Sequence, residues 1–218
     1  MLLDKKEYFF SHLTRMKVVD KDGKTVGKPG DALLDSETLQ VKSLILFGSF
    51  LEEKMEDLKL KEDVDPIVPL GSIAEEKVSE KKIVLSEGHD QLEATSSGWT
   101  VPEGTIQFSK LKKVHVFDKD GNKIGTVIDI GYHEDGTYTL VLGGGFMEEF
   151  LEKIKVFADK DLLVPQKSIS ELGMDKITIK HSRKDLKTTI EENVAPEQII
   201  AKHQVGFVPR GFSHQSFR

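Results

Sequence analysis

The chain has 218 residues, of which 38% are hydrophobic and 31% charged, and its formal net charge at pH 7 is −6. Its longest apolar stretch, residues 44–51, is far shorter than the ~20 residues that a membrane-spanning helix needs, so we expect no membrane span. Because the sequence has no cysteine and no secretory-signal pattern at its start, disulfides and thiolate chemistry are excluded and we expect a cytoplasmic protein.

The strongest pattern along the chain is a unit of about 80 residues that occurs twice in tandem. Both copies open on phenylalanine, serine, any residue and leucine, and both continue into a run that contains Asp-Lys-Asp-Gly. The matched segments are 10–13 with 108–111, 18–27 with 116–125, 50–53 with 146–149, 65–69 with 161–165, and 82–85 with 176–179. So many matches in one order indicate a duplication.

Each copy has the pattern of a short β-meander. The pairs Asp22-Gly23 and Asp120-Gly121 favour tight hairpin turns, because both residue types tolerate a positive φ. Later strands are expected at 32–34, 41–46, 67–68 and 83–85 in the first copy, and at 127–130, 137–142, 163–164 and 177–179 in the second. Short strands separated by turn residues favour a small closed barrel or a sandwich, which leaves few strand edges exposed.

A helical insertion is expected within each copy. In the second copy its apolar face has the spacing i, i+3, i+4, i+7 and consists of Met147, Phe150, Leu151 and Ile154. The corresponding series in the first copy is Leu51, Lys54, Met55 and Leu58. Because a lysine replaces the central phenylalanine, we expect only the second face to cover an apolar surface, and we regard it as a candidate docking face.

The composition predicts four segments. The first copy spans 1–87, a linker spans 88–105, the second copy spans 106–184, and a C-terminal helix and tail span 185–218. Trp99 lies in the linker and is expected to fix it to one barrel. A helix is expected within 188–203, where Pro196 breaks or starts it.

These residues resemble the PRC-barrel family over about 8–87 and 106–184. The resemblance rests on the Phe-Ser-x-Leu opening, the Asp-Gly turn, a following Ile/Val-Gly, Asp31 and Asp129, and a strand ending in Val-Pro. Two departures are Pro29, which stands where the second copy has Val127, and the long helical insertions.

The resemblance implies a mainly β fold: two tandem small barrels, each with a short helical insertion, followed by a C-terminal helix and tail. It also implies a docking module. Family members include the C-terminal domain of the ribosome maturation factor RimM, the cytoplasmic domain of the reaction centre H subunit, and archaeal stand-alone PRC-barrel proteins.

The sequence offers no catalytic, cofactor or metal site. A calcium loop counted from Asp20 or Asp118 lacks both the glycine at its sixth place and the glutamate at its twelfth, so hairpin turns are favoured. The run Gly143–Gly145 lacks the lysine of a phosphate loop and indicates a strand-to-helix turn. The seven histidines have no metal-binding spacing, and no serine lies in a nucleophile elbow. We therefore expect a protein that is not an enzyme and has no cofactor.

The C-terminal tail combines aromatic and basic residues, whereas disordered tails usually lack aromatics. Its candidate partner-binding residues are Phe207, Arg210, Phe212, His214, Phe217 and Arg218. One interpretation is a frayed terminus. The other is a linear motif that orders on a partner, either by inserting phenylalanines into protein pockets or by stacking on RNA bases.

Two function classes follow. The first hypothesis is a non-catalytic adaptor that binds protein partners in a larger assembly through its barrel faces and its tail. The alternative is a ribosome-associated factor similar to RimM, whose acidic body suits basic ribosomal proteins and whose basic tail suits RNA. A small-molecule enzyme would need a deep pocket lined by residues that the copies do not share. A homodimer is left open.

Overall fold

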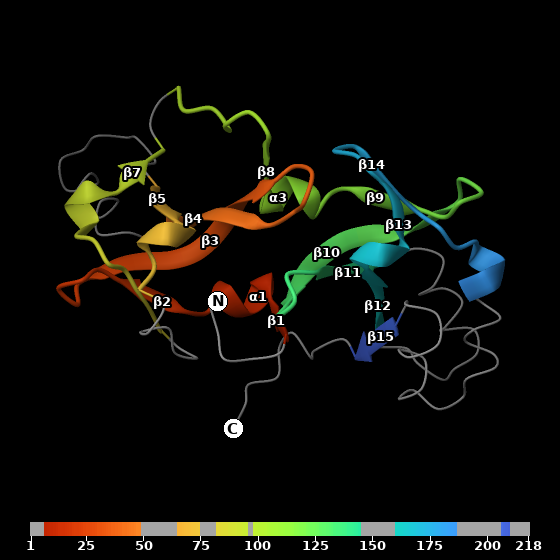
Figure 1. Ribbon diagram of the computed structural model, residues 1–218, viewed down its shortest axis with the longest axis horizontal. Helices are drawn as coiled ribbons and strands as arrows, with labels where there is room; N and C mark the ends of the chain where they lie inside the picture. Colours follow the sequence, from red (N-terminus) through yellow and green to blue (C-terminus); the bar gives the residue numbers. More distant parts are fainter. Residues whose placement is uncertain are drawn as a thin grey trace. The chain divides into compact units, whose positions relative to one another are not determined.

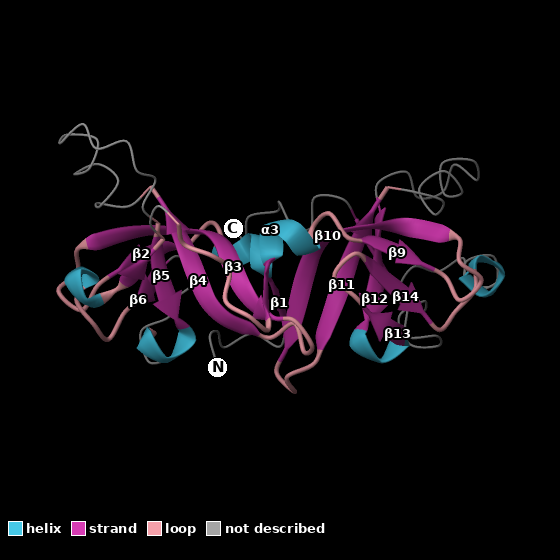
Figure 2. Cartoon of the chain, turned by 90° about the horizontal axis from the view of Figure 1, so that it is seen from above, coloured by secondary structure: helices cyan, strands magenta, loops and turns pink. Residues whose placement is uncertain are grey.

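The computed structural model describes residues 7–48, 65–74, 82–95, 98–144, 160–186 and 206–209, and these residues form two compact units. Unit 1 takes the described residues within Ser11–Ser109. Unit 2 takes those within Lys6–Phe10 and Lys110–Arg218. Both units are built mainly of β-strands with very short helices, as Figure 2 shows, so the prediction of a mainly β protein with small barrel-like domains is confirmed.

Unit 1 is a seven-stranded sheet with the order β6-β2-β3-β4-β5-β7, and β8 pairs with β3 beside that path. Its strands are β2 (Lys17–Val19), β3 (Thr25–Asp35), β4 (Val41–Phe47), β5 (Pro66–Pro69), β6 (Lys82–Val84), β7 (Glu93–Ala94) and β8 (Thr105–Gln107). The single turns η1 (Leu70–Ser72) and η3 (His89–Gln91) connect them. All pairings are antiparallel except that of β2 with β6, which is parallel.

Unit 2 repeats this arrangement with eight strands in the order β13-β14-β9-β10-β11-β12-β15, and β1 pairs with β10. Its strands are β1 (Glu7–Phe9), β9 (His115–Phe117), β10 (Lys123–His133), β11 (Tyr138–Gly143), β12 (Lys160–Pro165), β13 (Ile169–Leu172), β14 (Lys176–Ile179) and β15 (Gly206–Pro209). The turn η4 (Gln166–Ser168) follows β12. The expected strands are confirmed in both copies. Strands β1, β7, β8, β13 and β15 were not expected, and β7 and the first residue of β8 lie in the segment 88–105 that was predicted as a linker.

The strand that opens each copy completes the other copy's sheet (Figure 1). In unit 2, β1 pairs with the end of β10, where Tyr8 lies opposite Tyr132 and their ring centroids are 5.8 Å apart. In unit 1, β8 pairs with the end of β3, where Ile106 lies opposite Leu34. The two pairings have the same register at equivalent positions of the repeat. Neither copy therefore completes its sheet from its own sequence.

The opening motif Phe-Ser-x-Leu forms a one-turn helix directly after each exchanged strand. These helices are α1 (Phe10–Leu13) and α3 (Phe108–Leu111). The phenylalanine and leucine of each are buried, with Phe10 and Leu13 at 0% exposure and Leu111 at 1%. The motif thus anchors the chain at the point where it leaves one unit for the other.

The long strands β3 and β10 carry one irregularity at the same place. The register of β3 against β4 shifts between Pro29 and Asp31, and that of β10 against β11 shifts between Val127 and Asp129. The amide of Val127 donates a hydrogen bond to the Val114 carbonyl oxygen, at 3.1 Å. Proline has no such amide, so Pro29 is accommodated next to a bulge, where a missing ladder donor is tolerated.

The unit 1 sheet buries side chains on both of its faces. Leu44 and Leu46 are fully buried in the main core, and the side chains between and beside them form a second cluster of Leu33, Ile45 and Ile67. Trp99 of the linker packs against this cluster, as the sequence predicts. Burial on both faces explains why β4 carries the consecutive buried apolar residues Leu44, Ile45 and Leu46 rather than an alternating pattern.

Replacing Tyr8 with alanine tests the exchange directly. The substitution removes an aromatic contact worth ~0.5–1.5 kcal/mol, so we expect amide hydrogen exchange at residues 131–133 of β10 to accelerate roughly two- to tenfold. The matched variant Ile106→Ala should accelerate exchange at 33–35 of β3 instead. The reverse assignment, with Tyr8→Ala affecting 33–35, would show that each opening strand stays with its own copy.

Candidate functional site

Buried carboxylates are candidate functional groups, because a charged side chain is rarely buried unless it is paired or takes part in binding or catalysis. Among the described residues, Asp20 and Asp118 are 0% exposed, and Asp31 and Asp129 are 5% exposed. Each pair occupies equivalent positions in the two copies. A ligand could bind these carboxylates only through oxygens that accept no hydrogen bond from the protein itself.

In unit 1, Asp20 connects the β2–β3 turn to the segment that follows the last strand. Its Oδ1 accepts hydrogen bonds from the amides of Asp22 and Lys24, at 3.0 and 2.8 Å. Its Oδ2 lies 2.8 Å from Nδ1 of His89, which follows β6. The amide of Lys21 also donates to the Glu87 carbonyl oxygen, at 3.1 Å. We call this set of contacts the unit 1 latch.

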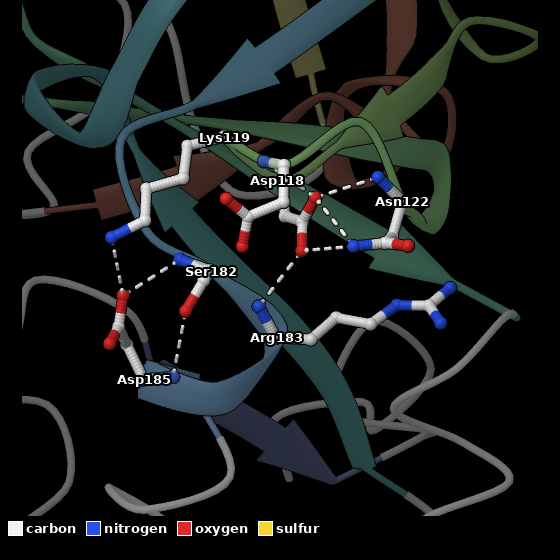
Figure 3. Close-up of polar contacts among 7 residues, drawn as sticks. Asp118, Lys119, Asn122, Ser182, Arg183 and Asp185 are labelled. Atoms are coloured by element: carbon white, nitrogen blue, oxygen red, sulfur yellow. Dashed lines mark hydrogen bonds and ion pairs between the residues drawn. The ribbon is translucent and has the colours of Figure 1, made fainter.

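In unit 2, Asp118 makes the equivalent connection, and Figure 3 shows it between Asn122 and Arg183. Its Oδ1 accepts from the amides of Asp120 and Asn122, at 3.0 and 2.7 Å, and the Asn122 side-chain amide reaches both oxygens. Its Oδ2 accepts from the amide of Arg183, at 2.9 Å. Lys119 donates its amide to the His181 carbonyl oxygen, at 3.2 Å. This is the unit 2 latch.

A capped helical turn supplies the far side of the unit 2 latch. The amide of Asp185 donates to the Ser182 hydroxyl oxygen, and the amide of Ser182 donates to Asp185 Oδ2, at 3.1 and 2.9 Å. This reciprocal arrangement is a capping box, which begins the turn at 183–186 and places the Arg183 amide at its first position (Figure 3). Lys119 Nζ lies 3.2 Å from Asp185 Oδ2 at the solvent-exposed edge.

The hydrogen bonds decide the charge state of both latch carboxylates. Burial alone would raise the pKa of Asp118, but hydrogen bonds from Asn122 and from the Arg183 and Asp120 amides outweigh it, so the pKa lies below its ordinary value. The pKa of Asp20 is lowered in the same way, with His89 in place of Asn122. Their contribution to stability is therefore present above the ordinary pKa and is lost as pH falls through the lower folded value.

Asp31 has a second structural task in unit 1. Its Oδ1 accepts from the amide of Ala32, at 2.8 Å, and from the amide of Ser109, at 2.9 Å. Ser109 follows the exchanged strand β8, so this bond fixes the donor strand to the bulge of β3. In unit 2, Asp129 Oδ1 accepts from the amide of Ile130, at 2.9 Å. Both carboxylates thus stabilise the bulge of the long central strand through Oδ1.

The predicted hairpin turns at both Asp-Lys-Asp-Gly runs are confirmed. Gly23 and Gly121 have φ values of +84° and +82°, and the amide of each donates to the carbonyl oxygen of the latch aspartate. Within the described ranges, no group of three or more His, Asp or Glu side chains is arranged to hold a metal ion. The latch positions His89 and Arg183 were missed from the sequence, although Ser182-x-x-Asp185 is a readable capping signal.

The predicted docking residues are placed only in part. Phe207 lies in β15, opposite Leu162 of β12. The remaining tail residues Arg210, Phe212, His214, Phe217 and Arg218 lie outside the described residues, as does the helical face Met147, Phe150, Leu151 and Ile154. The expected helix within 188–203 also lies outside them.

One packing difference between the units leaves an aromatic ring on the surface. In unit 1, Phe47 covers Gly30, where a Cβ atom would come within 2.1 Å of the ring, and Phe47 is 49% exposed. At the equivalent positions of unit 2, Ile128 covers Gly143, where a Cβ would come within 2.9 Å. In unit 1 the glycine lies on β3 and the large side chain on β4, whereas in unit 2 the glycine lies on β11 and the large side chain on β10. The contact is therefore kept, but only unit 1 has an exposed aromatic ring at this position.

Replacing Arg183 with proline should weaken unit 2, and Arg183→Ala is the matched control. Proline is well tolerated at the first position of a helix, so Arg183→Pro removes the amide donor to Asp118 while both variants lose the same side chain. A hydrogen bond to a charged group contributes about 1.5–3 kcal/mol, so the proline variant should unfold at a lower denaturant concentration.

The chain contains its own reporters for this measurement. All three tyrosines, Tyr8, Tyr132 and Tyr138, lie in unit 2, and the only tryptophan, Trp99, lies in unit 1. The tyrosine signal should therefore move to lower denaturant in the proline variant. Equal tyrosine midpoints in the two variants would mean that the amide of Arg183 contributes nothing to the latch.

Comparison with known proteins gives a match to a domain family over part of the chain. A search of curated proteins found no matching relative. Over the part of the chain that the structure describes, no helix is long and apolar enough to cross a membrane. Residues 103–186, which include the exchanged strand β8 and most of unit 2, match the PRC-barrel domain family, so the chain contains one stretch that is shown to be similar to that family.

Proposed function

We propose that the protein is a non-catalytic adaptor that docks onto a larger macromolecular assembly through its barrel faces and its C-terminal tail. The observation that carries this proposal is the use of both oxygens of the fully buried aspartates, Asp20 and Asp118, by the fold itself. The latch carboxylates of both units accept hydrogen bonds on both oxygens. A scaffold whose polar interior is committed to its own fold offers surfaces and edges to a partner.

Two further features support an adaptor. The match to the PRC-barrel domain family over 103–186 favours a domain that mediates protein interactions. Strands β6-β2-β3-β4-β5 of the first copy have the same order as β14-β9-β10-β11-β12 of the second, and we propose that the first copy is a PRC-barrel as well. The exposed ring of Phe47 adds an aromatic contact point on unit 1 alone. Aromatic residues are enriched at protein interfaces.

Sedimentation of native lysate on a sucrose gradient tests the proposal. The wild-type chain should migrate in heavy fractions, whereas a variant with Arg210, Phe212, Phe217 and Arg218 all changed to alanine should stay with monomer-sized proteins. The two proteins should melt at the same temperature. The control Lys110→Ala/Lys113→Ala removes two exposed cations from the body and should migrate like the wild type. A wild-type chain that stays at the top would contradict an adaptor.

The same gradient separates the adaptor from a ribosome-associated factor. The acidic net charge and the basic residues at the C-terminus favour that second candidate. Binding to ribosomal RNA depends on phosphate neutralisation and weakens as salt rises. Co-migration with a ribosomal subunit that is lost at the higher of two salt concentrations would identify the ribosome, and co-migration with another complex at both would favour the adaptor.

A further inference from the structure

The edge of β12 is covered by a strand from the C-terminal tail. Residues Gly206–Pro209 form β15, which lies beside β12 (Figure 1) and pairs with it antiparallel. In this register Leu163 lies opposite Gly206, and Asp161 lies opposite Val208. On its other side β12 pairs with β11, and its Leu162 and Val164 are buried. β12 is therefore held in unit 2 by its pairing with β11 and by its buried side chains, and its other edge pairs with the tail strand β15.

Segments that follow each copy have the same role in both units. In unit 1, β7 pairs with β5, the counterpart of β12, and covers its edge. There the amide of Thr95 donates to the Asp65 carbonyl oxygen and the amide of Asp65 donates to the Thr95 hydroxyl, both at 2.8 Å. The fold thus closes its sheets repeatedly with donor strands from elsewhere in the sequence, as β1 and β8 also show.

The covalent path to β15 is long enough to permit a choice of acceptor. Residues 187–205 connect the end of the described 160–186 range to β15. A chain of that length spans up to ~60 Å when extended. The ladder contacts of β15 are the same whichever molecule supplies the acceptor, so the balance depends on concentration. Pairing within one chain competes through an effective concentration on the order of millimolar, so exchange between molecules needs a comparable local concentration.

We propose that the β12 edge also accepts residues 206–209 from a second copy of this chain, so that tails exchange between molecules. Each molecule carries one acceptor edge, on β12, and one strand with the matching register, β15. A strand edge that its own tail has left is a template for pairing with another chain. The exchange couples molecules that an assembly has already concentrated. The exchange goes beyond the adaptor function; its role on an assembly rests on that proposed function, whereas the pairing itself does not.

Disulfide trapping tests the exchange, and the natural absence of cysteine makes it clean. Single variants Asp161→Cys and Val208→Cys place one thiol on each side of a facing pair. Mixed under mild oxidation, they form a disulfide between the two variants above the collision background when the tail of one molecule pairs with β12 of another. The pair Asp161→Cys with Lys113→Cys, whose thiols do not face each other, measures random collision.

We expect the facing pair to give several-fold more mixed dimer than the control pair, with a yield that rises with protein concentration. The double variant Asp161→Cys/Val208→Cys should close within one chain at low concentration, which shows that the facing geometry exists in the folded protein. A double variant that closes while the mixed pair stays at the control level would overturn the proposal. So would an Asp161→Cys chain that links to neither tail, because a different partner would then hold the edge.

Discussion

The structure depends on the exchange of one short strand in each direction. Strands β1 and β8 open the two copies, yet each supplies backbone hydrogen bonds to the long central strand of the other copy's sheet. A strand edge left open exposes unpaired amides and carbonyls, which costs stability and invites pairing with other chains. Duplication solves this problem within one molecule, because each copy provides what the other lacks.

The buried aspartates maintain this arrangement. Asp20 and Asp118 hold the first hairpin turn against the segment after the last strand, and Asp31 bonds to the amide of Ser109 beside the incoming strand β8. Across each latch the carboxylate meets a residue that follows the last strand, through the ring of His89 in unit 1 and the amide of Arg183 in unit 2, where the Asn122 side chain adds to it. The carboxylate is constant and its donors have diverged, which is consistent with a structural role for the charge.

The sequence predicted the strands, the hairpin turns and the packing of Trp99, because these depend on local turn chemistry and on apolar patterns that the repeat shows twice. It did not predict the exchange, since β1 and β8 have the same pattern whichever central strand they join. The tail pattern of Phe207 indicated an interaction, but not that its strand pairs with β12. Local patterns identify a strand and its faces, whereas the choice of partner depends on contacts between residues far apart in the sequence.

Cleaving the linker of the folded protein tests the exchange most directly. A protease site placed between Ser96 and Ser97 would leave β1 on one fragment and β8 on the other, although each strand belongs to a sheet built mainly from the opposite fragment. The account predicts that the two fragments co-elute after cleavage in native buffer and separate only when denatured. Two fragments that separate in native buffer and remain folded would contradict it.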